Sequence, residues 1–193
     1  NPTAVMMGRE DILKIVGAVD AMVVVDEAYM EFSEGSVLDE IENYDNLIVL
    51  KTCSKAFGMA AIRLGFAAAN ARITNILKTL KAPYNVNSMT QAVGCVILGH
   101  KEYLEKCAAQ IKEVTREFYQ DMKALAERKK DIQRLYPTET NFLYVKTERS
   151  DEIFEALKKE GISIRNMNGY LRISAGSKAE NRELVQVLDR LLQ

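Results

Sequence analysis

The stretch MVVVDEAYMEFSEGSVLDEIENYDNLIVLK, residues 22–51, decides the fold class of this chain. It holds two short hydrophobic runs, MVVVD at 22–26 and LIVLK at 47–51, joined by a polar loop and a short helical piece near 36–42. Both runs are rich in Val, Ile and Leu without polar alternation, which is typical of parallel strands covered on both faces. We therefore expect two neighbouring strands of a parallel sheet.

The segments around these strands continue the same pattern. Residues 9–19 (REDILKIVGAV) carry apolar residues at helical spacing, 64–69 (LGFAAA) form a third candidate strand, and 72–80 are predicted as a helix. Strands and helices that alternate through short connections indicate a layered α/β sheet.

The chain then changes character. The segment KAPYNVNS (81–88) ends one helix, and its Asn and Ser side chains can cap the next. We expect that next helix to run from about 88 to 130, with one interruption at Gly99 and His100. This long helical region would lead into the C-terminal part of the chain.

Beyond Pro137 the pattern favours a small α+β unit. NFLYVK (141–146) alternates as a strand does, and 150–161 reads as a helix with Ser150 as its cap and Gly161 as its stop.

Two short strands, ISIRN and YLRIS, flank Asn168-Gly169, which is a hairpin signal. A last helix is expected at about 178–192. We therefore predict two domains, an α/β part at 1–100 and a connecting helix with a small α+β domain at 101–193.

Composition excludes several classes of function. The formal net charge is −1 and no long Lys/Arg run occurs, so we expect no nucleic-acid partner. No apolar run reaches the ~20 residues that a membrane-spanning helix needs, so no membrane partner is expected. Three widely spaced cysteines favour a reducing, cytoplasmic location, and the single histidine argues against a histidine-based metal site. The chain begins Asn1-Pro2-Thr3, and we expect it to be part of a longer protein.

Polar residues follow both buried strands at their carboxyl ends, where open α/β sheets bind ligands. Asp26 and Tyr29 follow the first run. The second run leads into KTCSKAFGMAAIRLGF, residues 51–66, in which Lys55 stands among small residues. The other candidates in that stretch are Thr52, Ser54 and Arg63.

These side chains match the needs of one ligand. A lysine can form a Schiff base with an aldehyde cofactor, and a carboxylate can keep a pyridine nitrogen protonated. Hydroxyls and a guanidinium suit a phosphate ester. Together they predict pyridoxal 5′-phosphate (PLP). Simpler roles stay open: Lys55 as a surface lysine, Asp26 as a cap, Thr52 and Ser54 as turn formers, and Arg63 paired with a core carboxylate.

Five segments carry a resemblance to a known family, and they occur in the family's order over nearly the whole chain. They are NPT (1–3), VVVDEAYMEF (23–32), KTCSKAFGMAAIRLGF (51–66), PYNVN (83–87) and YLRISAGSKAEN (170–181). On these segments the chain resembles the fold-type I PLP-dependent aminotransferases, most closely the histidinol-phosphate aminotransferase branch. The resemblance implies a large domain with a three-layer, mostly parallel sheet, followed by a small α+β C-terminal domain.

The resemblance also implies roles for individual residues. Lys55 would bind the cofactor aldehyde and move the proton at the substrate Cα, Asp26 would pair with the pyridine nitrogen, and Tyr29 would bind the 3′-oxygen. Arg172 would take the substrate carboxylate, and Arg165 would be a second anion clamp. The full cofactor-binding set would be Asn1, Asp26, Tyr29, Thr52, Ser54, Lys55 and Arg63.

Three features depart from the family pattern. Ala4 stands where the family's NPTG turn has glycine, and the segment from Arg165 to Arg172 looks shorter than in many members. We expect the chain to lack the N-terminal part of such an enzyme, which in the family carries the glycine-containing phosphate loop and the aromatic residue that stacks on the cofactor. We therefore expect this chain alone to be inactive.

The predicted function is amino-group transfer between histidinol phosphate and 2-oxoglutarate in histidine biosynthesis, by a homodimer. Two alternatives remain. A related PLP enzyme would decarboxylate threonine phosphate or transaminate aromatic amino acids. A non-catalytic α/β module would hold a phosphate or nucleotide through Lys55 and Arg63, which leaves Asp26 unexplained, since a carboxylate beside a bound phosphate is unfavourable.

Overall fold

The computed structural model describes residues 1–193, which divide into two compact units. One unit is Met7–Ala108, and the other joins Asn1–Met6 to Ala109–Gln193. The boundary falls inside α4 (Lys101–Ala126), and each unit is described by itself below. The predicted domains, 1–100 and 101–193, stay a prediction, because a compact unit is not by itself an independently folding domain.

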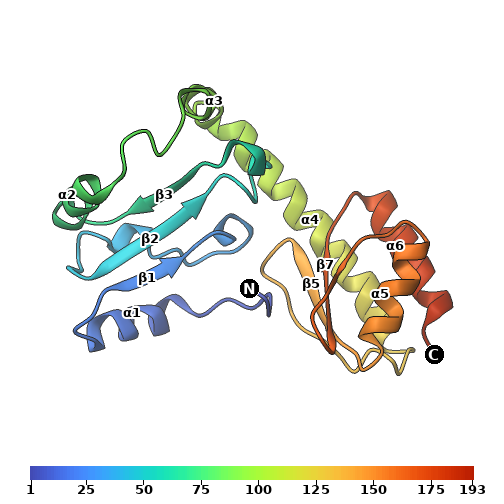
Figure 1. Ribbon diagram of the computed structural model, residues 1–193. Helices are drawn as coiled ribbons and strands as arrows, with labels where there is room; N and C mark the ends of the chain where they lie inside the picture. Colours follow the sequence, from blue (N-terminus) through green and yellow to red (C-terminus); the bar gives the residue numbers. More distant parts are fainter. The chain divides into compact units, whose positions relative to one another are not determined.

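The first unit is built on a three-stranded sheet in the order β1-β2-β3 (Figure 1). Its strands are β1 (Val23–Asp26), β2 (Leu47–Thr52) and β3 (Gly65–Ala68). β1 and β2 are parallel, as predicted, whereas β2 and β3 are antiparallel. The sheet of this chain is therefore mixed, and only the β1–β2 pair has the parallel arrangement expected for the large domain. The loop between β2 and β3 contains only the 3₁₀ turn η3 (Ala60–Ile62), and no helix carries the chain back across the sheet.

One face of this sheet is covered by α1 (Arg9–Ala18). Ile12 and Val16 of α1 form a core with Leu47 and Val49 of β2. Val24 lies between two core-facing valines of β1, points to the other face, and is 53% exposed. The prediction that both faces of the strands are covered is therefore wrong for the sheet of this chain.

The short 3₁₀ helices η1 (Met30–Phe32) and η2 (Leu38–Glu40) lie in the segment between β1 and β2, where the sequence predicted a helical piece near 36–42. The first unit also contains α2 (Ala71–Leu80) and α3 (Ser88–Leu98).

Asparagine caps begin both of these α-helices. The Asn70 side chain accepts a hydrogen bond from the Ile73 N–H, and the Asn87 side chain accepts one from the Thr90 N–H. The predicted cap in KAPYNVNS is thus confirmed at Asn87. The predicted interruption near Gly99 and His100 is confirmed as well, since α3 ends at Leu98 and α4 starts at Lys101.

The second unit has a four-stranded antiparallel sheet in the order β4-β5-β7-β6. The strands are β4 (Arg134–Leu135), β5 (Phe142–Lys146), β6 (Arg165–Asn166) and β7 (Tyr170–Ser174). Residues of α4, α5 (Ser150–Lys159) and α6 (Lys178–Leu191) share one hydrophobic core with this sheet. This is the small α+β arrangement that the sequence predicted.

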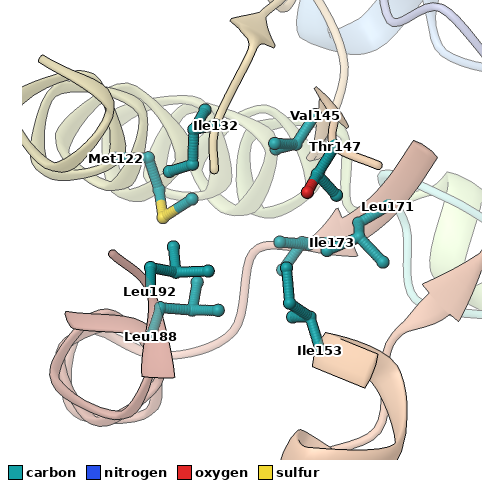
Figure 2. A pocket seen from close by; sticks show the side chains of 9 residues that line it. All are labelled: Met122, Ile132, Val145, Thr147, Ile153, Leu171, Ile173, Leu188 and Leu192. Atoms are coloured by element: carbon teal, nitrogen blue, oxygen red, sulfur yellow. The ribbon is translucent and has the colours of Figure 1, made fainter. Parts of the chain in front are cut away.

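A small cavity of about 10 Å³ lies within that core (Figure 2). It is lined by Met122, Ile132, Val145, Thr147, Ile153, Leu171, Ile173, Leu188 and Leu192. Apart from Thr147 these side chains are apolar, and the volume is far below the roughly 300–1,000 Å³ of ligand pockets. The cavity is a packing gap and no binding site.

Two local predictions for the second unit have different outcomes. Asn168 and Gly169 both have positive φ, 51° and 88°, as the predicted two-residue hairpin turn requires. Gly161 has a φ of 79° just beyond α5, which confirms the predicted stop. The predicted cap at Ser150 is wrong, because Ser150 lies inside the helix and its Oγ accepts a hydrogen bond from the Gly169 N–H.

None of the helices combines the length and the apolar composition that crossing a bilayer would require.

Ala4 occupies a backbone conformation that suits glycine. Its φ is 64°, it is 1% exposed, and its carbonyl accepts a hydrogen bond from the Glu139 N–H at 2.9 Å. A Cβ in the left-handed region is strained, so the alanine noted above as a departure from NPTG carries a conformational cost. The turn at residues 1–4 is therefore formed with alanine in place of glycine, in a strained backbone conformation.

We expect Ala4→Gly to stabilise the protein by about 0.5–1 kcal/mol, since relief of the left-handed strain exceeds the added entropy of the unfolded chain. Thermal unfolding followed by circular dichroism measures the shift of Tm. Ala124→Gly, at an exposed position inside α4, is the matched control and should lower Tm because glycine disfavours helix. A lowered Tm in both variants would contradict the strain at Ala4.

Candidate active site

The predicted polar residues meet at one edge of the first sheet. Asp26 is the last residue of β1, and Thr52 is the last residue of β2. The two strands are parallel with Asp26 opposite Leu50, so their carboxyl ends share this edge. The backbone of Glu27 extends the pairing, donating its N–H to the Leu50 carbonyl at 2.9 Å.

Lys55 follows β2 in a tight loop and is half-buried. Its ammonium lies over the ring of Tyr29, 5.4 Å from the centroid, and forms no ion pair. The loop is held by its own backbone, with the Gly58 N–H bonded to the Lys55 carbonyl and the Met59 N–H to the Cys53 carbonyl. Lys55 is therefore not a freely solvated surface lysine, and its amine has no anionic partner within the chain.

Asp26 is exposed, and its Oδ1 accepts a hydrogen bond from the Ala28 N–H at 3.0 Å. This bond stabilises the turn that leads from β1 toward Tyr29, so a local structural role of the kind considered above is present. The carboxylate pairs with no cation, which leaves it able to accept a further charged donor.

Thr52 and Ser54 also have a local role, because the Thr52 Oγ1 accepts a hydrogen bond from the Ser54 N–H at 3.1 Å. Arg63 has a φ of 53°, and its Nη1 donates to the Ala60 carbonyl at 3.2 Å. Its guanidinium is exposed and pairs with no carboxylate, so the alternative of a core ion pair is wrong. The Cys53 N–H bonds to the Leu64 carbonyl, and Arg63 directly precedes Leu64. Arg63 therefore lies near the turn formed by Thr52 and Ser54.

The other predicted site residues belong to the second unit. Arg165 and Arg172 lie directly opposite each other on β6 and β7. Arg172 donates from Nη1 to the Asn1 Oδ1 at 3.2 Å, its guanidinium lies 4.6 Å from the Phe142 ring centroid, and its buried Nε has no hydrogen-bond partner. Two like charges on opposite strand positions are unfavourable unless an anion joins them. The structure thus brings Asn1, Arg165 and Arg172 together, in a different unit from Lys55.

An ionic cluster that was not predicted from the sequence lies beside this edge. Lys51 lies between two carboxylates, 3.3 Å from the Glu27 Oε2 and 2.8 Å from the Glu31 Oε1. All three side chains are largely buried, with exposures of 23% for Lys51, 1% for Glu27 and 15% for Glu31. The sequence does contain a signal for this cluster. Lys51 ends one hydrophobic strand, and Glu27 and Glu31 follow the neighbouring strand four residues apart.

Cys53, between Thr52 and Ser54, is fully buried. Burial raises the pKa of its thiol, and the negative charge of Glu31 raises it further. The thiol therefore stays protonated and acts as a small packed side chain.

The chemistry available at this edge of the sheet follows from its charged groups that form no ion pair. An amine, a carboxylate and a guanidinium, each without an ionic partner in the chain, stand with two hydroxyls around the ends of β1 and β2. The amine can attack a carbonyl, the carboxylate can accept from a protonated ring nitrogen, and the guanidinium can bind an anionic oxygen. The set fits a ligand that carries all three features.

Curated proteins of similar sequence include histidinol-phosphate aminotransferases. A histidinol-phosphate aminotransferase of Clostridium kluyveri is 40% identical over 198 residues, covering 100% of this chain and 55% of the relative. The chain therefore spans about half the length of the curated relatives it matches.

Solved structures share the fold. The crystal structure of the histidinol-phosphate aminotransferase from Clostridium acetobutylicum has a TM-score of 0.88 at 22% identity, covering 99% of this chain and 61% of that one. L-threonine-O-3-phosphate decarboxylase from Porphyromonas gingivalis has a TM-score of 0.86 at 22% identity, covering 99% of this chain and 61% of that one. The Sinorhizobium meliloti histidinol-phosphate aminotransferase, solved with pyridoxal-5′-phosphate, has a TM-score of 0.81 at 22% identity, covering 99% of this chain and 55% of that one.

The sequence model of one family, described as aminotransferase class I and II, matches residues 1–188, which is nearly the whole chain. On this match the chain belongs to the class I and II aminotransferase family.

Proposed function

We propose that the protein, at its full natural length, is a PLP-dependent aminotransferase that moves an amino group between histidinol phosphate and 2-oxoglutarate. The observation that carries this proposal is the unpaired amine of Lys55, held over Tyr29 at the strand edge where Asp26 ends β1. The Clostridium kluyveri relative, a histidinol-phosphate aminotransferase by name, supports the choice of substrate.

The residues of the first unit would hold PLP as follows. Thr52, Ser54 and Arg63 would bind the phosphate, Tyr29 would bind the 3′-oxygen, and Asp26 would accept a hydrogen bond from the pyridine N–H. When bound, PLP supplies an aldehyde for the amino group and a ring that takes up the electron pair of the substrate Cα–H bond. Lys55 would hold the cofactor until the amino donor arrives, and its Nζ would then take and return the proton at the substrate Cα.

The residues of the second unit would orient the substrate. Arg172 would bind the substrate carboxylate or phosphate through the terminal nitrogens of its guanidinium, one of which already donates to the Asn1 Oδ1. Arg165, on the opposite strand position, is a second anion clamp, and an anion shared by the two guanidiniums relieves their repulsion. Asn1 bonds to Arg172, and its role at the cofactor 3′-oxygen rests on the family resemblance alone.

We further propose that the enzyme is a cytoplasmic homodimer. All three cysteines are free, which suits a reducing compartment. The family resemblance supports the dimer, since fold-type I enzymes build their active sites at a subunit interface.

The alternative of a threonine-phosphate decarboxylase stays open, because the Porphyromonas gingivalis enzyme shares the fold with a TM-score of 0.86. That likeness, at 22% identity, concerns the fold alone. The two reactions need the same cofactor residues and differ in which bond at the substrate Cα is broken, C–H for transfer and C–C for decarboxylation.

The experiment that separates them uses the protein at its full natural length with PLP. Incubation with histidinol phosphate and 2-oxoglutarate should produce glutamate, measured by chromatography. Incubation with threonine phosphate should release no carbon dioxide. Carbon dioxide release without glutamate would favour the decarboxylase. Failure to bind PLP at all would overturn the enzyme proposal and leave the phosphate-binding module.

A further inference from the structure

We propose that Lys51 is a positioning residue for the cofactor site and acts through Glu27 and Glu31. We call these three residues the Lys51 cluster. It ties the loop that carries Asp26 and Tyr29 to the end of the strand that leads to Lys55. This inference rests on the proposed function, because its effect is expressed in the binding of PLP.

The cluster joins two segments that are far apart in the sequence. Glu27 continues β1, and Lys51 lies on β2 on the same face of the sheet as Val49, so both point toward the core beneath α1. The Lys51 Nζ bonds to Glu27 at 3.3 Å and pairs with Glu31 at 2.8 Å. One ammonium therefore bridges the start of the loop and the helix η1 within it.

Further bonds close the loop on itself. The Glu27 Oε1 accepts from the Val37 N–H at 2.8 Å, and its Oε2 accepts from the Ser36 Oγ at 2.7 Å. The Met30 N–H bonds to the Glu27 carbonyl, and the Phe32 N–H bonds to the Tyr29 carbonyl. The whole segment from Glu27 to Val37 is thus held at both ends by one carboxylate.

The site residues adjoin this cluster directly. Asp26 precedes Glu27, Tyr29 lies between the two glutamates, and Thr52 follows Lys51. A shift of Glu27 or Glu31 relative to β2 would move Tyr29 away from the Lys55 ammonium, which now lies 5.4 Å from its ring centroid. A misplacement of about 1 Å is enough to cost a site roughly 10²-fold.

Charge makes Lys51 the critical member. The cluster contains two carboxylates and one ammonium, and the Glu31 Oε2 is buried without a hydrogen-bond partner. Without Lys51, two carboxylates would face each other in a buried place with no cation between them, which is strongly unfavourable. The backbone pairing with β2 ends at the Glu27 N–H, which bonds to the Leu50 carbonyl, so repulsion would displace the loop beyond it together with Tyr29.

The test uses the full-length protein and the variant Lys51→Met, which keeps the length of the side chain and removes its charge. We expect PLP to bind roughly tenfold to a hundredfold more weakly, as for the loss of other groups that orient ligand-binding residues. The measurement is the dissociation constant of PLP, from its absorbance change on binding. Lys51→Arg retains the charge, and its dissociation constant for PLP should stay within about threefold of the value for the unmodified protein.

Two controls separate positioning from simple loss of stability. Val16→Ala truncates a core residue of the same unit, 1% exposed, and should lower Tm while PLP affinity stays unchanged. Lys14→Met removes a lysine whose side chain is 72% exposed and whose pair with Asp11 lies on the surface. It should change neither quantity.

The outcomes are distinct. Weakened PLP binding in Lys51→Met, with recovery in Lys51→Arg and none of the loss in Val16→Ala, supports the proposal. Unchanged PLP affinity in Lys51→Met overturns it. An equal loss of PLP affinity in Val16→Ala and Lys51→Met, at the same Tm, overturns it as well. Absence of PLP binding in the unmodified protein would instead overturn the proposed function.

Discussion

Replacement of Lys55 by alanine is expected to abolish both PLP attachment and turnover in the full-length enzyme. Lys55 is the half-buried amine at the strand edge, and it has no ionic partner within the chain. Loss of proton transfer by a positioned side chain alone costs about 10²–10⁴-fold in kcat. The measurements are kcat for glutamate formation and the mass of the protein after incubation with PLP and borohydride.

Lys55→Arg separates the charge from the nucleophilic amine, because arginine keeps the positive charge and forms no stable link to an aldehyde. We expect it to be as inactive as Lys55→Ala. Lys78→Ala, at an exposed position in the last turn of α2, is the matched control and should retain full labelling at Lys55. A PLP adduct that persists in Lys55→Ala on one other lysine would show that Lys55 is the wrong residue.

Replacement of Asp26 by asparagine is expected to lower kcat by roughly 10²–10³-fold, the usual cost of removing one preorganised electrostatic partner. The asparagine oxygen can still accept the hydrogen bond from the Ala28 N–H, now 3.0 Å from the Asp26 Oδ1, so the turn after β1 is retained. Only the charge that would keep the pyridine nitrogen protonated is lost. Steady-state kinetics give the change in kcat, and absorbance gives the PLP affinity.

Asp20→Asn is the control for Asp26→Asn, since Asp20 is an exposed carboxylate of the same unit. It should leave both quantities unchanged. Wild-type turnover in Asp26→Asn would reduce Asp26 to the structural role that its bond to Ala28 already shows.

Local features were predictable because their physical causes lie within a few residues. Asn168 and Gly169 form the expected turn because both tolerate positive φ, and Asn87 caps α3 because its side chain reaches an N–H three residues on. Ser150 shows the limit of this reasoning. Its hydroxyl takes a backbone partner at Gly169, and a residue so distant in the sequence could not be foreseen.

The candidate site divides in the same way. Asp26, Thr52, Ser54 and Lys55 were identified from their place after hydrophobic runs, and the parallel pairing of β1 with β2 puts them on one edge. The antiparallel pairing of β3 with β2 was not predicted, because a hydrophobic run indicates a strand and does not show which way the strand runs.

The sequence by itself determined the alternation of helices and strands, the caps and turns, and the residues that carry the family resemblance. These depend on side-chain period and on short-range hydrogen bonds. Tertiary structure alone decided that Lys51 bridges Glu27 and Glu31, and that Arg172 bonds to Asn1 across 171 positions of the chain. Such pairs form only when packing brings distant segments together, and no local pattern records the partner that a buried charge will find.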